Sequence, residues 1–158
     1  MIRIGQGIDV HAFEEGRPLI LGGVRIANRG GLAGHSDADA VLHAITDALL
    51  GAVAAGDIGS YFPSEDPRWK GAESRLFLEE ASRIVTDMGW RIANLDVTVI
   101  AQKPKLAAHR DPMRSAIASI LKLGLEQVSV KATTTDHLGF TGRQEGIAAL
   151  AVVLLVKD

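Results

Sequence analysis

The sequence predicts an α+β fold of one domain, in which helices cover one face of a β-sheet. Some segments alternate apolar and polar residues with the period of two that marks a strand, and others repeat apolar residues with the period of a helix. Their order (two strands, helices, a strand, a helix, two strands) is typical of an α+β sandwich. No repeat or linker interrupts the chain, so we expect a single domain over residues 1–158.

The N-terminal part is predicted to contain a strand, a hairpin and a helix. Residues 2–10 alternate isoleucine or valine with polar or glycine positions, as a half-buried strand does. Residues 18–26 hold two short apolar runs around a pair of glycines, which favours a hairpin. Ser36 followed three residues later by Asp39 resembles a capping box, and predicts a helix from about residue 38 to residue 53.

The C-terminal part is predicted to contain two helices and three strands. Residues 73–88 carry one apolar stripe, and Gly89 is the glycine expected just after such a helix. Pro112 suits the first turn of a further helix, which would run to Leu123 and end at Gly124. Three segments rich in apolar and β-branched residues are the predicted strands: residues 92–101, 128–132 and 147–156.

The composition excludes several classes of function. The chain has no cysteine, so it builds no disulfides, cysteine-ligated metal sites or thiol nucleophile. Seventeen basic and nineteen acidic residues give a net charge of −2, without the positive field that nucleic-acid binding needs. The most apolar stretch, residues 146–156, is short of the roughly 20 residues of a spanning helix. We expect a soluble, cytoplasmic domain that binds neither nucleic acid nor membrane.

The last predicted strand indicates that the chain associates with copies of itself. It is apolar at nearly every position, which suits burial on both faces. Helices that cover only one face of the sheet leave the other face to a partner. We therefore expect self-association.

Asp9, His11 and His43 form the first candidate site. Residues two apart on a strand point to the same face, so Asp9 and His11 emerge together while Val10 would face the core. His43 on the predicted helix could meet them, and one carboxylate with two imidazoles is the pattern of a catalytic zinc site with one open position. The alternative is that His11 is a surface residue and His43 a hydrogen-bonded core histidine.

The segment from His35 to Asp39 is the second candidate site. Backbone N–H groups at a helix start attract anions, and His35 beside them could hold a phosphate oxygen. Alternatively, Ser36, Asp37 and Asp39 only complement the helix dipole as ordinary cap residues.

Three later segments carry further polar groups. Asp57 lies in a glycine-flanked loop, where it could bind substrate hydroxyls or hold a turn. Residues 133–135 are threonines, a lining suited to phosphate or nucleotide groups, and Asp136 could carry a hard cation such as Mg²⁺ or begin a turn. Residues 101–106 form a strand end and a proline-stiffened turn that could read a base edge. Arg143 could anchor an anion or be a surface charge.

Taken in series, these segments resemble the 2-C-methyl-D-erythritol 2,4-cyclodiphosphate synthase family. The runs that carry the resemblance are G-x-D-V-H at 7–11, G-H-S-D-x-D at 34–39, L-H-A-I-T-D-A-L-L-G at 42–51, G-D-I-G at 56–59, A-Q-K-P-K at 101–105, K-A-T-T-T at 131–135 and L-G-F-T-G-R at 138–143. The resemblance extends from about residue 2 to residue 157. The ordered set is far more specific than any one motif.

The resemblance implies a ferredoxin-like sandwich with a four-stranded sheet, helices on one face and a small hairpin. It also implies a homotrimer with active sites between subunits. The implied reaction cyclises 4-diphosphocytidyl-2-C-methyl-D-erythritol 2-phosphate and releases CMP, in the non-mevalonate pathway to isoprenoid precursors. Because the substrate's own 2-phosphate attacks its β-phosphorus, such an enzyme acts by positioning and charge neutralisation.

The resemblance also assigns roles to residues at the reacting end. Asp9, His11 and His43 would bind Zn²⁺, and Asp136, where the family usually has Glu, would hold a second cation, Mg²⁺ or Mn²⁺. His35 and Thr134 would steady the transition state through phosphate contacts. The methylerythritol pocket would be lined by Ser36, Asp57, Ile58, Gly59, Phe62 and Ser64, the last at a position where many members have Asp.

The remaining roles concern the nucleotide and the trimer axis. The cytidine end would contact Ala101, Lys103, Pro104, Lys105, Leu106, Ala107, Ala132, Thr133 and Thr135, mostly through backbone groups. Phe140 and Arg143 match positions near the trimer axis, where the family has been seen to hold an isoprenoid diphosphate.

Two other functions compete with the cyclase. One is a trimeric protein of the same fold that binds small molecules without catalysing a reaction. The complete set of metal-binding residues argues against it. The other is a metal-dependent phosphohydrolase, and no residue stands out as a base that would activate water.

Overall fold

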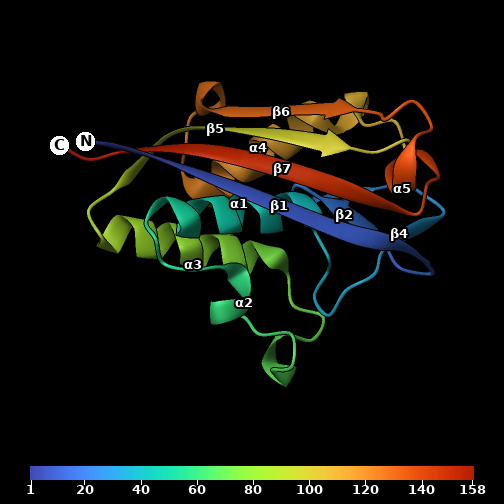
Figure 1. The fold of residues 1–158 in the computed structure, drawn as a ribbon, viewed down its shortest axis with the longest axis horizontal. Helices are drawn as coiled ribbons and strands as arrows, with labels where there is room; N and C mark the ends of the chain where they lie inside the picture. The colour runs from blue at the N-terminus through green and yellow to red at the C-terminus, as the bar shows by residue number, and fades with distance from the viewer.

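The computed structural model describes residues 1–158, which form a mixed β-sheet covered by helices on one face. The sheet has the strand order β4-β1-β7-β5-β6, and a separate two-stranded sheet pairs β2 with β3. The strands are β1 (Ile2–Glu15), β2 (Leu19–Leu21), β3 (Val24–Ile26), β4 (Gly30–Leu32), β5 (Arg91–Ile100), β6 (Val128–Thr133) and β7 (Gly146–Val156). Both chain termini lie at one end of the sheet, and β4 lies at the other (Figure 1).

The helices are three long and two short α-helices, with three 3-10 turns between them. The long helices are α1 (Ala40–Ala52), α3 (Ser74–Asp87) and α4 (Arg110–Leu121), and the short ones are α2 (Ile58–Tyr61) and α5 (Gly139–Gly142). The 3-10 turns are η1 (Pro67–Trp69), η2 (Ala107–His109) and η3 (Leu125–Gln127). No helix reaches the length and apolar character that a membrane span requires.

The long strands pair in a register that sets the site. β7 runs antiparallel to β1 on one side and to β5 on the other, and β5 runs parallel to β6. In this register Asp9 pairs with Ala149, Ala149 with Val99, and Val99 with Ala132. Residues from four strands therefore form one row across the same end of the sheet.

The alternation along β1 separates a helix face from an open face. Gly5 and Gly7 are buried against α1, whereas Ile4 and Ile8, one residue away from them, are 69% and 55% exposed. Val10 is also exposed on this open face. The expectation that Val10 faces the core is wrong: Asp9 and His11 share the helix face with the glycines.

Helix α1 forms the centre of the core. It packs against β1 and β7 on one side and against α3 on the other, and eleven of its thirteen residues are buried. A helix enclosed in this way is apolar all round, which is why residues 40–52 carry few polar side chains. The buried imidazole of His43 is therefore an exception that calls for partners.

Asp39 ties the β2–β3 hairpin to the start of α1. Its fully buried carboxylate caps the helix by accepting from the N–H of Leu42, and it also accepts from the N–H groups of Gly22 and Gly23. Burial raises the pKa of Asp39 to about 6, although these donors favour the ionised form. The N-cap is thus Asp39 itself rather than the predicted Ser36.

Three further differences from the sequence prediction concern element boundaries. The sheet has five strands instead of four, because the short strand β4 pairs with the end of β1. Helix α4 ends at Leu121 rather than Leu123, and its C-cap is Lys122, which takes the left-handed conformation, rather than Gly124. Short helix α2 forms in the loop expected around Asp57, and short helix α5, which was not predicted, forms between the last two strands. The predicted α+β arrangement and the hairpin are confirmed.

We expect Asp39→Ala to lower the free energy of unfolding by about 2–4 kcal/mol, because the helix loses its cap and two further backbone N–H groups lose their acceptor. Chemical denaturation measures this loss. The control Asp87→Ala removes an exposed carboxylate of α3 and should cost less than about 1 kcal/mol. Equal losses in the two variants would contradict the tie between hairpin and helix.

Candidate metal centre and its cavity

Asp9, His11 and His43 meet where α1 packs on β1. Asp9 and His11 point toward the helices from the strand, and His43 faces them from the first turn of α1. The His11 Nε2 atom lies 2.8 Å, and the His43 Nδ1 atom 3.1 Å, from the same Asp9 carboxylate oxygen. The two ring nitrogens are 3.3 Å apart, and all the potential ligand atoms lie within 4.8 Å of one another. One chain therefore assembles the predicted triad.

The hydrogen bonds of His11 direct a lone pair into this triad. Its Nδ1 atom lies 2.7 Å from the carbonyl oxygen of Ala33, which only accepts, so Nδ1 carries the proton and Nε2 presents a lone pair. The Asp9 oxygen that faces it is an acceptor as well. Acceptors this close repel each other unless a cation or proton lies between them. The donor set of one carboxylate and two imidazoles fits a divalent transition metal.

The ionisation of Asp9 and His11 is coupled. Burial opposes the charged form of Asp9, but the adjacent imidazoles of His11 and His43, which attract the carboxylate when they are protonated, outweigh it and hold the pKa of this carboxyl below its usual value. Burial likewise opposes the charged form of His11, but Asp9 outweighs it and raises the pKa of that imidazole. A proton and a metal ion therefore compete for the same atoms.

A cavity of about 210 Å³ opens beside the triad. It is lined by His11, His35, Ser36, His43, Ile58, Gly59, Phe62, Ser64, Trp69 and Phe77. It brings together two of the triad residues, the predicted phosphate contact His35 and five of the six residues predicted for the methylerythritol pocket. Residues from β1, the loop before α1, α1 itself and the loop after it thus form one concave surface.

Trp69 and Phe77 line this cavity and were not predicted. Their rings lie 5.2 Å and 4.5 Å from the ring of Phe62, centroid to centroid, and the three side chains form one aromatic wall. They come from the 3-10 turn η1, from α3 and from the loop after α2. Such spacing leaves no periodic signal in the sequence, so only the tertiary structure reveals the wall.

Arg17 holds the loop that carries His35 and Ser36. Its guanidinium donates to the carbonyl oxygens of Gly34 and Ser36, at 2.6 Å and 2.7 Å. The His35 Nε2 atom lies 3.3 Å from the carbonyl oxygen of Asp66. Sequence analysis did not identify Arg17, which lies outside the motif that it stabilises.

Asp57 has a local structural partner. It caps α2, and its carboxylate accepts hydrogen bonds from the Ser60 hydroxyl and the Ser60 N–H, which hold its pKa below the usual value. Unlike its neighbours Ile58 and Gly59, it does not line the cavity. The structure therefore supports the turn-forming alternative for Asp57, and its contact with substrate stays a prediction.

A second cavity, of about 160 Å³, lies beside the ends of β5 and β6. It is lined by Val99, Leu106, Ala107, Arg110, Met113, Val130, Lys131 and Ala132, which include three of the predicted cytidine contacts. Of the other predicted contacts, Ala101 donates its N–H to the carbonyl of Thr133, and the peptide bond between Lys103 and Pro104 is cis. Lys105 is exposed.

Within one chain the two cavities lie near opposite edges of the sheet, both on its helix-covered face. Asp9 and Ala132 share the row across β1, β7, β5 and β6, so they are separated by three strand spacings, or about 14 Å. The metal triad and the predicted nucleotide contacts are therefore not joined into one pocket by a single subunit.

The remaining residues with predicted roles lie in the segment between β6 and β7. The Thr134 hydroxyl donates to the carboxylate of Asp136, which is exposed, left-handed in conformation and outside the triad. The Thr135 hydroxyl bonds to that of Thr141 in α5. In the same segment, Phe140 is exposed and Arg143 pairs with Glu145.

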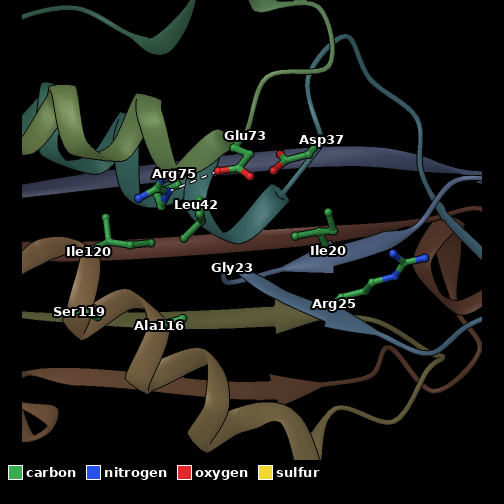
Figure 2. Close-up of a pocket in the computed structure, with 10 residues that line it drawn as sticks. All are labelled: Ile20, Gly23, Arg25, Asp37, Leu42, Glu73, Arg75, Ala116, Ser119 and Ile120. Atoms are coloured by element: carbon green, nitrogen blue, oxygen red, sulfur yellow. Dashed lines mark ion pairs between the residues drawn. The ribbon is translucent and has the colours of Figure 1, made fainter.

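A further cavity, of about 440 Å³, lies on the helical side of the molecule. Figure 2 shows it between the β2–β3 hairpin, the starts of α1 and α3, and α4. It shares no lining residue with the cavity at the triad. Asp37, from the His35–Asp39 segment, borders it together with Glu73 and Arg75, which pair with each other.

Comparisons with known proteins agree along the whole chain. The family model described as the YgbB family matches residues 2–156. A 2-C-methyl-D-erythritol 2,4-cyclodiphosphate synthase of Bacillus cereus (strain ATCC 10987 / NRS 248) is 57% identical over 157 residues, which are 99% of each chain. A protein of the same name from Bacillus mycoides (strain KBAB4) is also 57% identical over 99% of each chain.

Solved structures share the fold. The bifunctional IspDF from Campylobacter jejuni matches with a TM-score of 0.96 and 46% identity, and this chain, covered completely, spans 43% of that protein. A 2C-methyl-D-erythritol-2,4-cyclodiphosphate synthase in a form bound to CDP matches with a TM-score of 0.90 and 40% identity, over 98% of this chain and 100% of the other. A CDP complex of IspF from Plasmodium falciparum is 37% identical, with a TM-score of 0.87 over 99% and 97% of the two chains.

We expect His11→Ala to weaken Zn²⁺ binding by more than about 100-fold, because it removes one of three ligand atoms, and the loss of a group that only hydrogen-bonds to a ligand costs about 10–100-fold. Competition against a chromophoric chelator measures the affinity. The partly exposed His11 contributes little to the core, so the midpoint of thermal unfolding should stay close to that of the wild-type chain. His109→Ala, outside the triad, is the control, and equal affinities of the two variants would exclude His11 as a ligand.

Proposed function

This chain belongs to the YgbB family, and we propose that it acts as its cyclodiphosphate synthase relatives do. It cyclises 4-diphosphocytidyl-2-C-methyl-D-erythritol 2-phosphate to 2-C-methyl-D-erythritol 2,4-cyclodiphosphate and releases CMP, as a lyase of the non-mevalonate pathway. An oxygen of the 2-phosphate attacks the β-phosphorus of the diphosphate and closes the ring. The bond between the β-phosphorus and the oxygen of CMP breaks in the same displacement.

The triad at the wall of the 210 Å³ cavity is the observation that carries this proposal. The reaction needs no protein nucleophile, because the substrate's own phosphate attacks, and no base, because no proton is removed from carbon. It does bring two negatively charged phosphate groups close together. A site for this chemistry must therefore neutralise charge and fix geometry. Ligand atoms for a divalent cation at one wall, with His35 and Ser36 beside them, meet that need.

Zn²⁺ is the metal we propose for Asp9, His11 and His43, with Mg²⁺ or Mn²⁺ at Asp136. When bound, the zinc ion would supply the positive charge that polarises the diphosphate. His35 would donate to phosphate oxygens from the loop clamped by Arg17, and Thr134 would do so from the end of β6. Because the carboxylate arm of Asp136 is one methylene shorter than that of Glu, we expect water to complete more of the second cation's coordination.

The rest of the cavity suits the methylerythritol part of the substrate. Ile58, Gly59 and Phe62 offer an apolar wall, to which Trp69 and Phe77 belong, and Ser64 offers a hydroxyl. Asp57 would contribute by capping α2, whose residues Ile58 and Gly59 line the cavity. Its carboxylate would contact a substrate hydroxyl by turning away from Ser60. Ser64 replaces the Asp of many members, so we expect a weaker or water-mediated contact at this position.

The cavity beside β5 and β6 suits the cytidine end. Its lining is mostly apolar, and the neighbouring strand ends present backbone groups of the kind that read a base edge. Two of the similar solved structures contain CDP, which supports a nucleotide pocket in this family. Its contacts would include Ala101, Lys103, Pro104, Lys105, Leu106, Ala107, Ala132, Thr133 and Thr135.

A homotrimer with active sites between subunits would join the two halves. The metal triad and the nucleotide cavity lie about 14 Å apart in one chain, so a second copy would bring its nucleotide cavity to the first copy's triad. The open face of the sheet offers the interface, because it exposes large apolar side chains of β1 and β7: Ile2, Ile4, Ile8, Val10 and Val152. A patch of this kind marks a surface that another subunit covers.

Phe140 and Arg143 complete the proposal. Both are exposed on the segment around α5, at the end of the sheet opposite the termini (Figure 1). An aromatic ring and a guanidinium would suit the chain and the diphosphate of an isoprenoid diphosphate near the trimer axis. The cytoplasmic location expected from the sequence stays a prediction.

We expect the purified protein, supplied with Zn²⁺ and Mg²⁺, to convert the substrate to a cyclic diphosphate and one equivalent of CMP. Phosphorus NMR separates this product from linear phosphates, because the ring shows two mutually coupled phosphorus resonances and carries no phosphomonoester group, whereas the substrate and linear products do. Chelation of the metals should stop the conversion. Linear products would contradict cyclisation, and tight binding of isoprenoid diphosphates without any CMP would favour the ligand-binding alternative.

We expect Ile4→Asp to dissociate the trimer, because it places a charge in the apolar interface. Sedimentation velocity should show a monomer that makes no cyclic product but still binds Zn²⁺, since the triad lies within one chain. The matched control is Leu76→Asp, at an exposed apolar position of α3 on the helical side. A trimeric Ile4→Asp variant with full activity would exclude the open face as the interface.

A further inference from the structure

The imidazole of His43 has a second set of contacts on the side away from Asp9. Its Nε2 atom lies 2.7 Å from the hydroxyl oxygen of Ser74, the first residue of α3, and Ser74 is completely buried. The Ser74 hydroxyl in turn makes a short hydrogen bond to one carboxylate oxygen of Asp37. His43, Ser74 and Asp37 therefore form a continuous chain of hydrogen bonds that starts at the metal triad.

The number of available protons determines the direction of these bonds. The Asp37 carboxylate only accepts, and a serine hydroxyl has a single proton to donate. Ser74 therefore donates to Asp37, and its oxygen presents lone pairs to His43. The Nε2 atom of His43 must then be the donor, which leaves the lone pair of Nδ1 facing Asp9 and His11.

Asp37 is held in place by backbone groups. Its N–H donates to the carbonyl oxygen of Ala72, and its second carboxylate oxygen accepts from the N–H of Ser74. The oxygen that receives the Ser74 hydroxyl also lies 3.2 Å from the N–H of Asp39. These contacts join the loop before α1 to the start of α3, so the carboxylate has little freedom to turn away from Ser74.

The other face of Asp37 borders the cavity on the helical side of the molecule. In Figure 2 its side chain lies beside Glu73 at the wall of this 440 Å³ cavity. The carboxylate is therefore only partly buried. The chain thus extends from a partly exposed carboxylate through a buried hydroxyl to the triad.

We propose that Ser74 and Asp37 are positioning residues that set the tautomer and the ring orientation of His43, so that its Nδ1 atom is ready to bind the metal. This inference rests on the proposed metal centre. The Ser36 hydroxyl also approaches the His43 Nε2 atom, but at 3.3 Å, and it already accepts from the N–H of Ala38. Ser74 is therefore the principal partner of Nε2. Histidine ligands of metals commonly have an acceptor of this kind on the second ring nitrogen.

The first test reads the tautomer of His43 directly. Nitrogen-15 NMR of the metal-free wild-type chain, at a pH where the imidazole is neutral, should show the proton of His43 on Nε2. In Ser74→Ala the fraction with the proton on Nδ1 should rise. A wild-type His43 with its proton on Nδ1 would overturn the proposal, and this result does not depend on any bound metal or on turnover.

The second test measures Zn²⁺ affinity. Ser74→Ala should bind Zn²⁺ about 10–100-fold more weakly than the wild-type chain, the usual cost of losing such a partner. Asp37→Asn should cause a smaller loss, since its side-chain amide no longer requires Ser74 to be the donor. If Ser74→Ala fails to fold, Asp37→Asn and the wild-type tautomer decide the question. Unchanged affinity in both variants would overturn the proposal.

Thr46→Val is the matched control. Thr46 is also fully buried on α1, but its hydroxyl donates to the carbonyl of Leu42 and does not contact the imidazole. Its loss should leave both the His43 tautomer and the Zn²⁺ affinity unchanged. If the wild-type chain binds no Zn²⁺, both the proposed metal centre and the role of Ser74 in preparing it are wrong. If the chain binds Zn²⁺ but the proton of metal-free His43 is on Nδ1, only the proposed chain of hydrogen bonds is wrong.

Discussion

The close contact between α1 and β1 is the constraint on which the site depends. A β-carbon at Gly7 would lie 1.9 Å from the carbonyl oxygen of Ala44, and one at Gly5 would lie 1.8 Å from that of Ala48. Only glycine lets the helix approach the strand this closely. Because α1 lies so close to β1, the side chains of Asp9 and His11 on the strand reach the imidazole of His43 on the helix. A bulkier residue at either glycine would push the helix outward and separate the three ligand atoms.

Hydrogen bonds hold one side of the site, whereas the other side is open. Asp39 fixes the start of α1 to the hairpin, and the Ser74–Asp37 pair fixes α3 to the loop before α1. The imidazole of His43 is therefore held from both ends of its ring. The cavity side, by contrast, is formed by loops that carry His35 and Ser64, where a ligand can be accommodated. The cavity proposed for the nucleotide lies at the other end of the row that runs from Asp9 to Ala132, which is the structural argument for the proposed active site between subunits.

Much of the fold and of the metal triad could be predicted from the sequence, and the failures have common physical causes. The period of apolar residues located the long strands and helices, but it could not tell which face of β1 is covered, so Val10 was assigned to the wrong face. Short strand β4 and short helices α2 and α5 have too few residues for a period. The cap of α1 was misplaced because Ser36 and Asp39 are both good caps, and burial against the hairpin selects Asp39.

Sequence alone was enough to predict the α+β class, the long elements, the family resemblance and the Asp9–His11–His43 set, because these follow from local periodicity and from motifs in a fixed order. Which polar groups share a cavity became clear only from the packing of the elements. Trp69, Phe77, Arg17 and Ser74 come from segments without a common motif, and their contacts arise where packed elements cross. Contacts between residues far apart in the chain depend on packing distances, and sequence spacing does not encode those distances directly.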